Sequence, residues 1–179
     1  MKTYLLLLVS ILLTSCSSID INVYEDNNPK LDLKEYFSGD LTAHGIIKDR
    51  SGQVIRYFNV EMNGTWSKDG VGILEEKFIF DDESIEYRTW TFTPIKEGNK
   101  IRYLAKANDT VASVPVNITG NAFFMDYDLL INYRGDELQV RIEDKMYLIN
   151  QQVMINESTM IKYGLNVGYI TLTIIKQTP

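Results

Sequence analysis

Apolar and polar residues alternate one by one along most of this chain, and this alternation restricts its fold more than any other feature. Residues 53–63, 121–133 and 137–150 all repeat with a period of two. In the first run, for example, Phe58 falls on the opposite face from Asn59. Because successive side chains of a strand point to opposite faces, each run predicts a strand with one face toward a core.

Short segments rich in turn-forming residues separate these runs, and they predict hairpins between neighbouring strands. The segments are Arg50-Ser51-Gly52, Lys68-Asp69-Gly70, Asp81-Asp82-Glu83-Ser84, Glu97-Gly98-Asn99, Thr119-Gly120-Asn121 and Arg134-Gly135-Asp136. We expect an all-β fold, an antiparallel up-and-down meander of about nine or ten strands, with one short helical turn in residues 31–37. Closure into a barrel would protect the edges of such long strands, and a two-sheet sandwich is the alternative.

The N-terminus carries the parts of a bacterial lipoprotein signal. Lys2 precedes an apolar run that is shorter than the roughly 20 residues needed to span a bilayer. The run ends in Leu13-Thr14-Ser15-Cys16, which matches the lipobox, where the cysteine is diacylated before cleavage. We therefore predict a signal peptide in residues 1–15 and a lipid on Cys16.

Two or three acyl chains hold a protein on a membrane almost permanently, so the mature chain should be tethered and not membrane-spanning. Ser17, and not Asp, follows the cysteine. This favours the inner leaflet of the outer membrane, facing the periplasm. The polar and acidic composition of residues 16–30 predicts a flexible tether, and residues 31–179 have a size suited to a single β-barrel domain.

The charge and the rare residue types exclude several classes of function. Without its signal peptide the chain has 17 basic and 24 acidic side chains, a formal charge of −7, which argues against nucleic acid as a partner. His44 is the only histidine and Cys16 the only cysteine. We expect no catalytic site, no metal and no cofactor. The acidic pair Glu75-Glu76 is expected at a solvated turn or strand rim.

Two charged residues lie on faces that should be buried. Arg56 shares a face with Phe58, and Asp144 stands in line with Ile142 and Met146. A buried charge needs a partner, so one interpretation is a structural ion pair, or packing of Arg56 on a ring at a barrel end. The other is that Arg56, together with Arg88, binds the carboxylate or phosphate head of a lipid. Aromatic rings would then line the cavity or fill the core, among them Phe58, Trp66, Trp90 and Tyr127.

Several short motifs are typical of one protein family. They include Pro29-Lys30-Leu31-Asp32-Leu33, Asp49-Arg50-Ser51-Gly52, Val60-Glu61-Met62-Asn63-Gly64-Thr65-Trp66, Glu75-Glu76-Lys77-Phe78, Arg88-Thr89-Trp90, Ala107-Asn108-Asp109 and Lys162-Tyr163-Gly164. From about Tyr24 to Lys176 the chain resembles the proteobacterial lipoproteins known as domain of unknown function 3833. The resemblance implies a lipocalin-like (calycin-like) barrel. Relatives tend to be encoded beside fatty-acid-modifying enzymes, which points toward lipid by association only.

These observations favour a membrane-anchored periplasmic protein, not an enzyme, that binds or carries a fatty acid or other lipid in a barrel cavity. The alternative is a structural or accessory envelope lipoprotein that holds no ligand and acts by binding another envelope protein. The barrel interior discriminates between them, because a continuous apolar cavity of roughly 300 Å³ or more would favour the carrier. A filled interior would favour the accessory protein.

Overall fold

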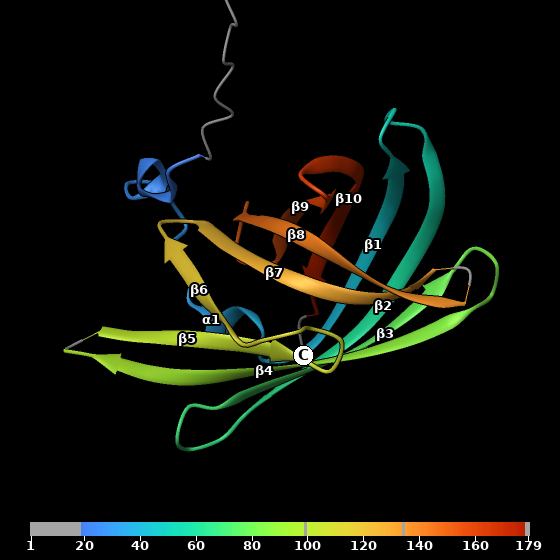
Figure 1. The fold of residues 1–179 in the computed structure, drawn as a ribbon. Helices are drawn as coiled ribbons and strands as arrows, with labels where there is room; N and C mark the ends of the chain where they lie inside the picture. Colours follow the sequence, from blue (N-terminus) through green and yellow to red (C-terminus); the bar gives the residue numbers. More distant parts are fainter. Residues whose placement is uncertain (1–18, 99, 134, 178–179) are drawn as a thin grey trace, which may run out of the picture.

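A computed structural model describes residues 19–98, 100–133 and 135–177 of the chain, and these form a closed antiparallel β-barrel (Figure 1). The strands are β1 (Gly39–Asp49), β2 (Val54–Trp66), β3 (Gly72–Phe80), β4 (Ile85–Glu97), β5 (Lys100–Ala107), β6 (Val114–Thr119), β7 (Ala122–Tyr133), β8 (Asp136–Leu148), β9 (Val153–Lys162) and β10 (Leu165–Lys176). A short 3-10 helix, η1 (Ile21–Tyr24), and one turn of α-helix, α1 (Leu33–Tyr36), precede them. Across these described ranges, no helix is long and apolar enough to cross a membrane.

The strands follow one another around the barrel in chain order, and the first strand closes it. β1 pairs with β2 on one side and with β10 on the other, where residues 41–49 are matched with residues 168–176. The predicted all-β, up-and-down barrel is therefore confirmed, and the sandwich alternative is wrong. Consecutive strands are joined at all six predicted turn segments, and three further links, residues 108–113, 149–152 and 163–164, were not among them.

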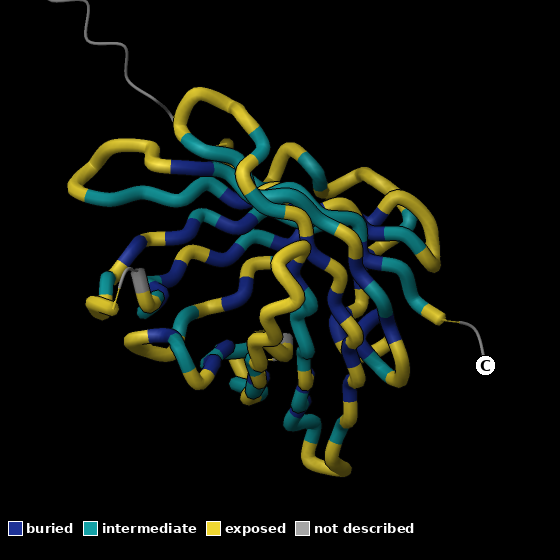
Figure 2. The backbone as a smooth tube through the Cα atoms, turned by 90° about the vertical axis from the view of Figure 1, so that its right-hand side faces the viewer, coloured by how far each residue is buried: buried dark blue, intermediate teal, exposed yellow. Residues whose placement is uncertain are grey.

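The faces of the strands follow the predicted alternation. Phe58, Val60 and Met62 are buried inside the barrel, whereas the intervening Asn59 and Glu61 are exposed. Figure 2 shows the same alternation, with buried positions along the strands and exposed turns at both ends. Because a shift of one residue would turn every apolar side chain outward, burial of this face fixes the register of the strand.

One end of the barrel, which we call the plugged end, is filled by α1 and the residue after it. The side chain of Asp32 caps α1 by accepting a hydrogen bond of 2.8 Å from the backbone N–H of Glu35. The hydroxyl of Tyr36 donates to the carbonyl of Ile174 at 3.0 Å. The Nζ of Lys176 donates to the carbonyls of Glu35, Tyr36 and Ser38, so the last strand holds the end of the helix.

Apolar packing completes the plug. Leu33, Tyr36 and Phe37 are all buried, and the ring of Phe37 stacks on that of Phe92 with 6.4 Å between centroids. The opposite end, which we call the mouth, is bordered by the turns at residues 50–53, 81–84, 134–135 and 163–164.

Residues 19–30, the described part of the predicted tether, are held against the barrel and are not the flexible segment that their composition predicted. Tyr24 of η1 packs against the rings of Phe124 and Tyr147, at 5.8 and 5.3 Å between centroids. The backbone N–H of Leu31 donates to the carbonyl of Gly120 at 2.8 Å. Three aromatic rings and one backbone hydrogen bond outweigh the polar character of the segment, so η1 is fixed beside the plugged end. Cys16 and the signal peptide lie outside the described residues.

A prediction about the plug follows from Gly64, which lies on the interior face of β2. A Cβ at this position would lie 1.6 Å from the carbonyl oxygen of Phe37. We expect Gly64→Ala to lower the free energy of unfolding by about 3 kcal/mol, because backbone atoms of the plug must move. Urea unfolding of the full chain measures this change.

The matched control is Gly52→Ala in the β1–β2 turn. Its φ of +88° strains an alanine, but no atom lies within 4 Å of the new Cβ. A cost of about 1 kcal/mol is expected there. If the two variants lose the same stability, close packing of the plug on β2 is not what Gly64 provides.

Candidate functional site

Five polar side chains from separate parts of the chain meet inside the barrel, between the plug and the mouth. They are Glu76 of β3, Arg88 of β4, Asp109 of the β5–β6 link, Tyr127 of β7 and Asp144 of β8. The charges of the other four all act on the hydroxyl of Tyr127. We call these five residues the interior polar cluster.

The strand pattern places these residues inside. Glu76 lies directly opposite Arg88 in the β3–β4 ladder and shares a face with the buried Leu74. Asp144 lies opposite the buried Met125 in the β7–β8 ladder. In a closed barrel a side chain on the core face has no route to bulk solvent through the wall, so each of these charges must be balanced within the interior.

Arg88 and Asp109 form the most extensive contact of the cluster. The Nε of Arg88 donates to both carboxylate oxygens of Asp109, at 3.1 and 2.9 Å, and a terminal guanidinium nitrogen lies 2.8 Å from one of them. Planar two-point pairing of this kind is the strong form of an ion pair. Arg88 therefore already has a carboxylate partner from the protein.

This pair also fastens a weak part of the wall. β6 pairs with β5 only through its residues 114–116 and with β7 only through its residues 117–119. Toward the mouth, the gap between β5 and β7 is closed by the link, through hydrogen bonds of Leu130 N–H to the Asp109 carbonyl at 2.8 Å and of Val111 N–H to the Asp128 carbonyl at 2.9 Å. The side chain of Asp109 ties this link to β4 from inside.

Asp144 is held by two neighbours on β9. One of its carboxylate oxygens accepts hydrogen bonds from the hydroxyl of Ser158, at 2.7 Å, and from the side-chain amide of Asn156. Burial raises the pKa of Asp144, and the hydrogen bonds from Asn156 and Ser158 and the charge of Arg88 oppose this rise. The prediction that Asp144 faces the interior is confirmed by its burial.

Burial also shifts the pKa of Glu76. Burial raises the pKa of its carboxyl from 4.5 to about 7, Arg88 and the Trp90 side chain lower it, and the negative charges of Asp144 and Asp109 raise it further. One guanidinium cannot neutralise three carboxylates, so Glu76 keeps its proton to a higher pH than an exposed glutamate does. Sequence reasoning placed Glu76 at a solvated rim, and this placement is wrong.

The half of the interior toward the mouth is lined by apolar side chains that are only partly buried. They face inward, yet each retains accessible surface: Ile47, Phe78, Ile131, Leu138, Met160 and Ile170. Because neighbouring residues on each strand supply the outer face, this remaining surface lies at the mouth or inside the barrel. Around the plug, by contrast, Leu41, Phe123 and Met154 are almost completely buried.

Two hollows are lined in part by exposed residues of the outer face. One of about 500 Å³ is lined by residues of β10, β1 and β2 and the end of β3, including the outward-facing His44 and Tyr57 and the inward-facing Phe58. His44 contacts the side chain of Asn59 there at 2.7 Å. The other, of about 360 Å³, includes Lys48 and residues of β9 and β10. In the described ranges, no three His, Cys, Asp or Glu side chains are grouped so that they could hold a metal ion.

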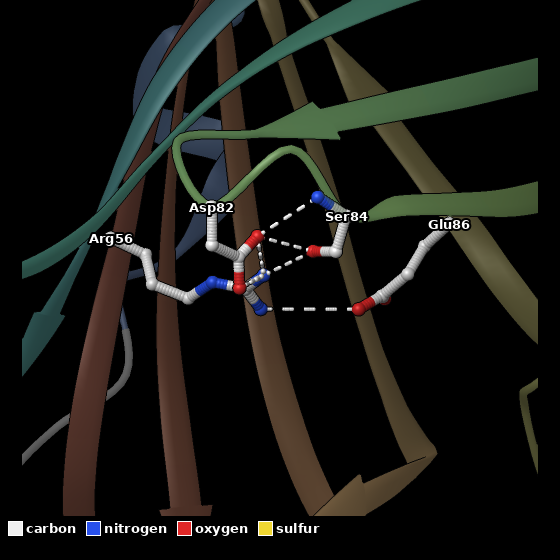
Figure 3. Close-up of polar contacts among 4 residues, drawn as sticks. All are labelled: Arg56, Asp82, Ser84 and Glu86. Carbon is white, nitrogen blue, oxygen red and sulfur yellow. Dashed lines mark hydrogen bonds and ion pairs between the residues drawn. The ribbon is translucent and has the colours of Figure 1, made fainter.

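Arg56 lies at the mouth and not with Arg88. Figure 3 shows its guanidinium reaching the β3–β4 turn, where it donates to Asp82 at 3.2 Å and to the hydroxyl of Ser84 at 2.8 Å. Glu86 lies 3.9 Å from its second terminal nitrogen. The guanidinium also covers the ring of Phe80, 3.6 Å from the centroid. This arrangement corresponds to the interpretation of a structural ion pair packed on a ring at a barrel end.

The predicted aromatic residues separate into three groups. Trp90 stands edge-on to Tyr127, with 5.1 Å between centroids, and so belongs with Arg88 and Asp144. Trp66 stacks on Phe92 and contacts the plug. Phe58 packs near the mouth, between Phe78 and Phe80. The structure thus brings four predicted site residues together, namely Arg88, Trp90, Tyr127 and Asp144.

Sequence reasoning missed Glu76 and Asp109. The position of Glu76, two residues from the apolar Leu74 and two from Phe78, was a usable signal. Asp109 lies outside any alternating run, and only the closed barrel shows that its link crosses beside β4.

A closed, ten-stranded, up-and-down barrel with one plugged end is a lipocalin-like fold. The chain belongs to the family described as "Protein of unknown function (DUF3833)", whose model matches residues 10–176. No curated protein sequence matches the chain.

Two solved structures share the fold at low sequence identity. The S-type phycobiliprotein lyase CPES from Guillardia theta has a TM-score of 0.53 and 9% identity over 83% of this chain and 94% of its own. A protein of unknown function from the DUF3598 family of Nostoc punctiforme has a TM-score of 0.56 and 14% identity. That match covers 84% of this chain and 51% of the other, so this chain spans about half of that protein.

The titration of Glu76 gives a testable pH dependence. Between about pH 4.5 and 7 the folded protein holds a proton on Glu76 that the unfolded chain has released. The contribution of this residue to the free energy of unfolding should therefore fall as the pH rises through this window, by up to about 3 kcal/mol, and stay constant above it. Urea unfolding across this range, compared between the native chain and Glu76→Gln, isolates the contribution.

Glu75→Gln is the control, because Glu75 is next to Glu76 but exposed on the outer face. It should keep the pH dependence of the native chain, whereas Glu76→Gln should lose that part of it. Identical pH profiles for the native chain and Glu76→Gln would contradict the assigned environment of Glu76.

Proposed function

We propose that this protein is a lipid-anchored, non-enzymatic carrier that binds a hydrophobic ligand in the mouth half of its barrel. The observation that carries the proposal is the partly buried apolar lining between the mouth and the interior polar cluster. A barrel packed only for stability would bury such side chains fully, since each buried CH₂ group contributes about 0.8 kcal/mol. Polar groups at the bottom of an apolar cavity are typical of ligand sites that fix orientation.

The position of η1 supports a specific orientation on the membrane. η1 packs at the plugged end, and Ile19 is the first described residue. Cys16 is three residues earlier, and an extended chain reaches at most about 3.6 Å per residue. A lipid on Cys16 would therefore attach within about 11 Å of Ile19. The plugged end then faces the outer membrane, and the mouth opens toward the periplasm.

The accessory-protein alternative is favoured by one feature of the outer wall. Ile55, Tyr57, Ile85 and Tyr87 lie on the outward face of β2 and β4, and between 49% and 68% of each is exposed. An exposed group of large apolar side chains is a common mark of protein contact surfaces. A partner protein could bind this surface whether or not the barrel holds a ligand. The carrier, by contrast, requires a bound apolar molecule in the barrel.

Removal of the lipid site tests the anchor. We expect Cys16→Ala to abolish incorporation of a labelled fatty acid and to release the chain from the membrane fraction, because no other cysteine is present. Metabolic labelling followed by membrane fractionation measures both effects. Ser17→Ala should still be labelled and membrane-bound, and an unlabelled native chain would contradict the anchor.

A charge placed in the lining tests the carrier. Leu138 faces the interior and Gln139, its neighbour on β8, faces outward. We expect native mass spectrometry of the full chain, extracted from its own membranes, to reveal a bound apolar molecule. Leu138→Arg should reduce its occupancy by about tenfold or more, a loss of about 1.4 kcal/mol in binding.

Gln139→Arg introduces the same charge outside and should keep the bound molecule, and circular dichroism checks that both variants fold. The carrier proposal fails if the native chain carries no apolar molecule, or if the two variants carry equal amounts.

A further inference from the structure

Two polar atoms of the interior polar cluster have no hydrogen-bond partner among the described residues. Asp144 is 4% exposed, and both of its side-chain hydrogen bonds go to the same carboxylate oxygen, Oδ1. Its second oxygen, Oδ2, has no hydrogen-bond partner among the described residues, and it is not one of the side-chain atoms fully sealed from solvent without a partner. Oδ2 therefore borders space inside the barrel.

Tyr127 shows the same property independently. Only 7% of it is exposed, and the edge-on contact with Trp90 fixes its ring. Within the described part of the chain its hydroxyl has no hydrogen-bond partner, and it too is absent from the atoms sealed from solvent. A buried hydroxyl that faces open space is ready to bond with something that enters that space.

The charges around this space are predominantly negative. Glu76, Asp109 and Asp144 supply three carboxylates against the single guanidinium of Arg88, which is already engaged by Asp109. Glu76 and Asp144 come from β3 and β8, which face each other across the barrel (Figure 1). An anionic head would meet two carboxylates with no unengaged cation, whereas a cationic head would balance them.

We propose that the interior polar cluster binds the protonated amine head of an amphiphile whose apolar tail extends toward the mouth. This inference rests on the proposed carrier function and specifies the class of its ligand. An ammonium group offers three N–H donors. The cluster provides two unpartnered acceptors, Oδ2 of Asp144 and the hydroxyl of Tyr127, together with the negative charge of Glu76, whose carboxylate also accepts from the Trp90 side chain. The tail would contact the partly buried lining, which includes Phe78 and Met160.

This amine-binding site differs in charge from the fatty-acid site that the sequence predicted. That hypothesis needs Arg56 or Arg88 to receive a carboxylate or phosphate head. Arg56 is bound to Asp82 at the mouth, and Arg88 is bound to Asp109 in the interior. Each guanidinium charge is already balanced by a carboxylate of the protein, so a carboxylate head would add a negative charge that no further cation of the cluster balances.

Binding of an amine head should depend on pH. Glu76 faces Arg88 on β4, Asp109 on the β5–β6 link, Tyr127 on β7 and Asp144 on β8, and its pKa is raised to about 7. An alkylamine stays protonated across the neutral range, so the change is in the site. Above pH 7 Glu76 is ionised and attracts the ammonium group; below it, the proton on Glu76 removes that attraction.

Equilibrium dialysis with three twelve-carbon probes tests the head group. The probes are radiolabelled dodecylamine, dodecanol and dodecanoic acid, and the full chain is held in lipid nanodiscs, with binding to empty nanodiscs subtracted. At pH 8 we expect dodecylamine to bind at least about tenfold more tightly than dodecanoic acid. This preference should shrink at pH 6.

Variants assign the preference to the cluster. Glu76→Gln and Asp144→Asn should each reduce the preference for dodecylamine over dodecanol, while Glu75→Gln on the outer face should keep it. Circular dichroism shows whether each variant folds. If one of the two interior variants does not fold, the other still tests the site.

The outcomes separate this inference from the carrier function. Equal binding of all three probes, or preference for dodecanoic acid, overturns the amine-binding site and leaves the carrier in place. Binding of none of them means that only water fills the space, and both proposals then fail.

Discussion

Closure of the barrel by the pairing of β1 with β10 is the constraint on which the rest of this structure depends. It leaves no strand edge exposed along residues 41–49 and 168–176, and it makes every strand position either internal or external. A charged residue on an internal position must then find its partner inside. The interior polar cluster is a direct result. Glu76 and Arg88 lie opposite each other in one ladder, and only a one-residue shift of strand register would turn them outward.

The two halves of the interior meet different physical demands. At the plugged end, Leu33, Tyr36 and Phe37 are buried, and Lys176 holds the helix through three backbone carbonyls. Toward the mouth the lining is apolar but incompletely buried, and the pKa of Glu76 is raised to about 7. Incomplete packing and partly compensated charge both reduce stability, and proteins concentrate such features at functional sites. The plugged end supplies the stability that the mouth half lacks.

Much of the fold could be predicted from the sequence, because alternation and turn residues are local signals. The strands, the hairpins, the short turn in residues 31–37 and the inward position of Asp144 follow from them. Three features could not be predicted in this way. The contact of Arg88 with Asp109 depends on where a link crosses the closed wall, and the packing of η1 on Phe124 and Tyr147 depends on rings distant in sequence. The sequence predicts a solvated turn or strand rim for both members of the pair Glu75-Glu76, but only Glu75 is exposed, because Glu76 shares the core face of β3 with Leu74.

Because β6 is short, the barrel wall has fewer backbone hydrogen bonds around β6 than elsewhere. Between β7 and β8 the ladder runs from residue 122 to residue 133, whereas β6 is joined to each neighbour over three residues only. Cooperative opening follows the distribution of backbone hydrogen bonds, so segments with few of them separate at lower free energy than the whole domain. The β5–β6 link is therefore the part of the wall that should separate at the lowest free energy. The ion pair of Arg88 with Asp109 opposes this local opening.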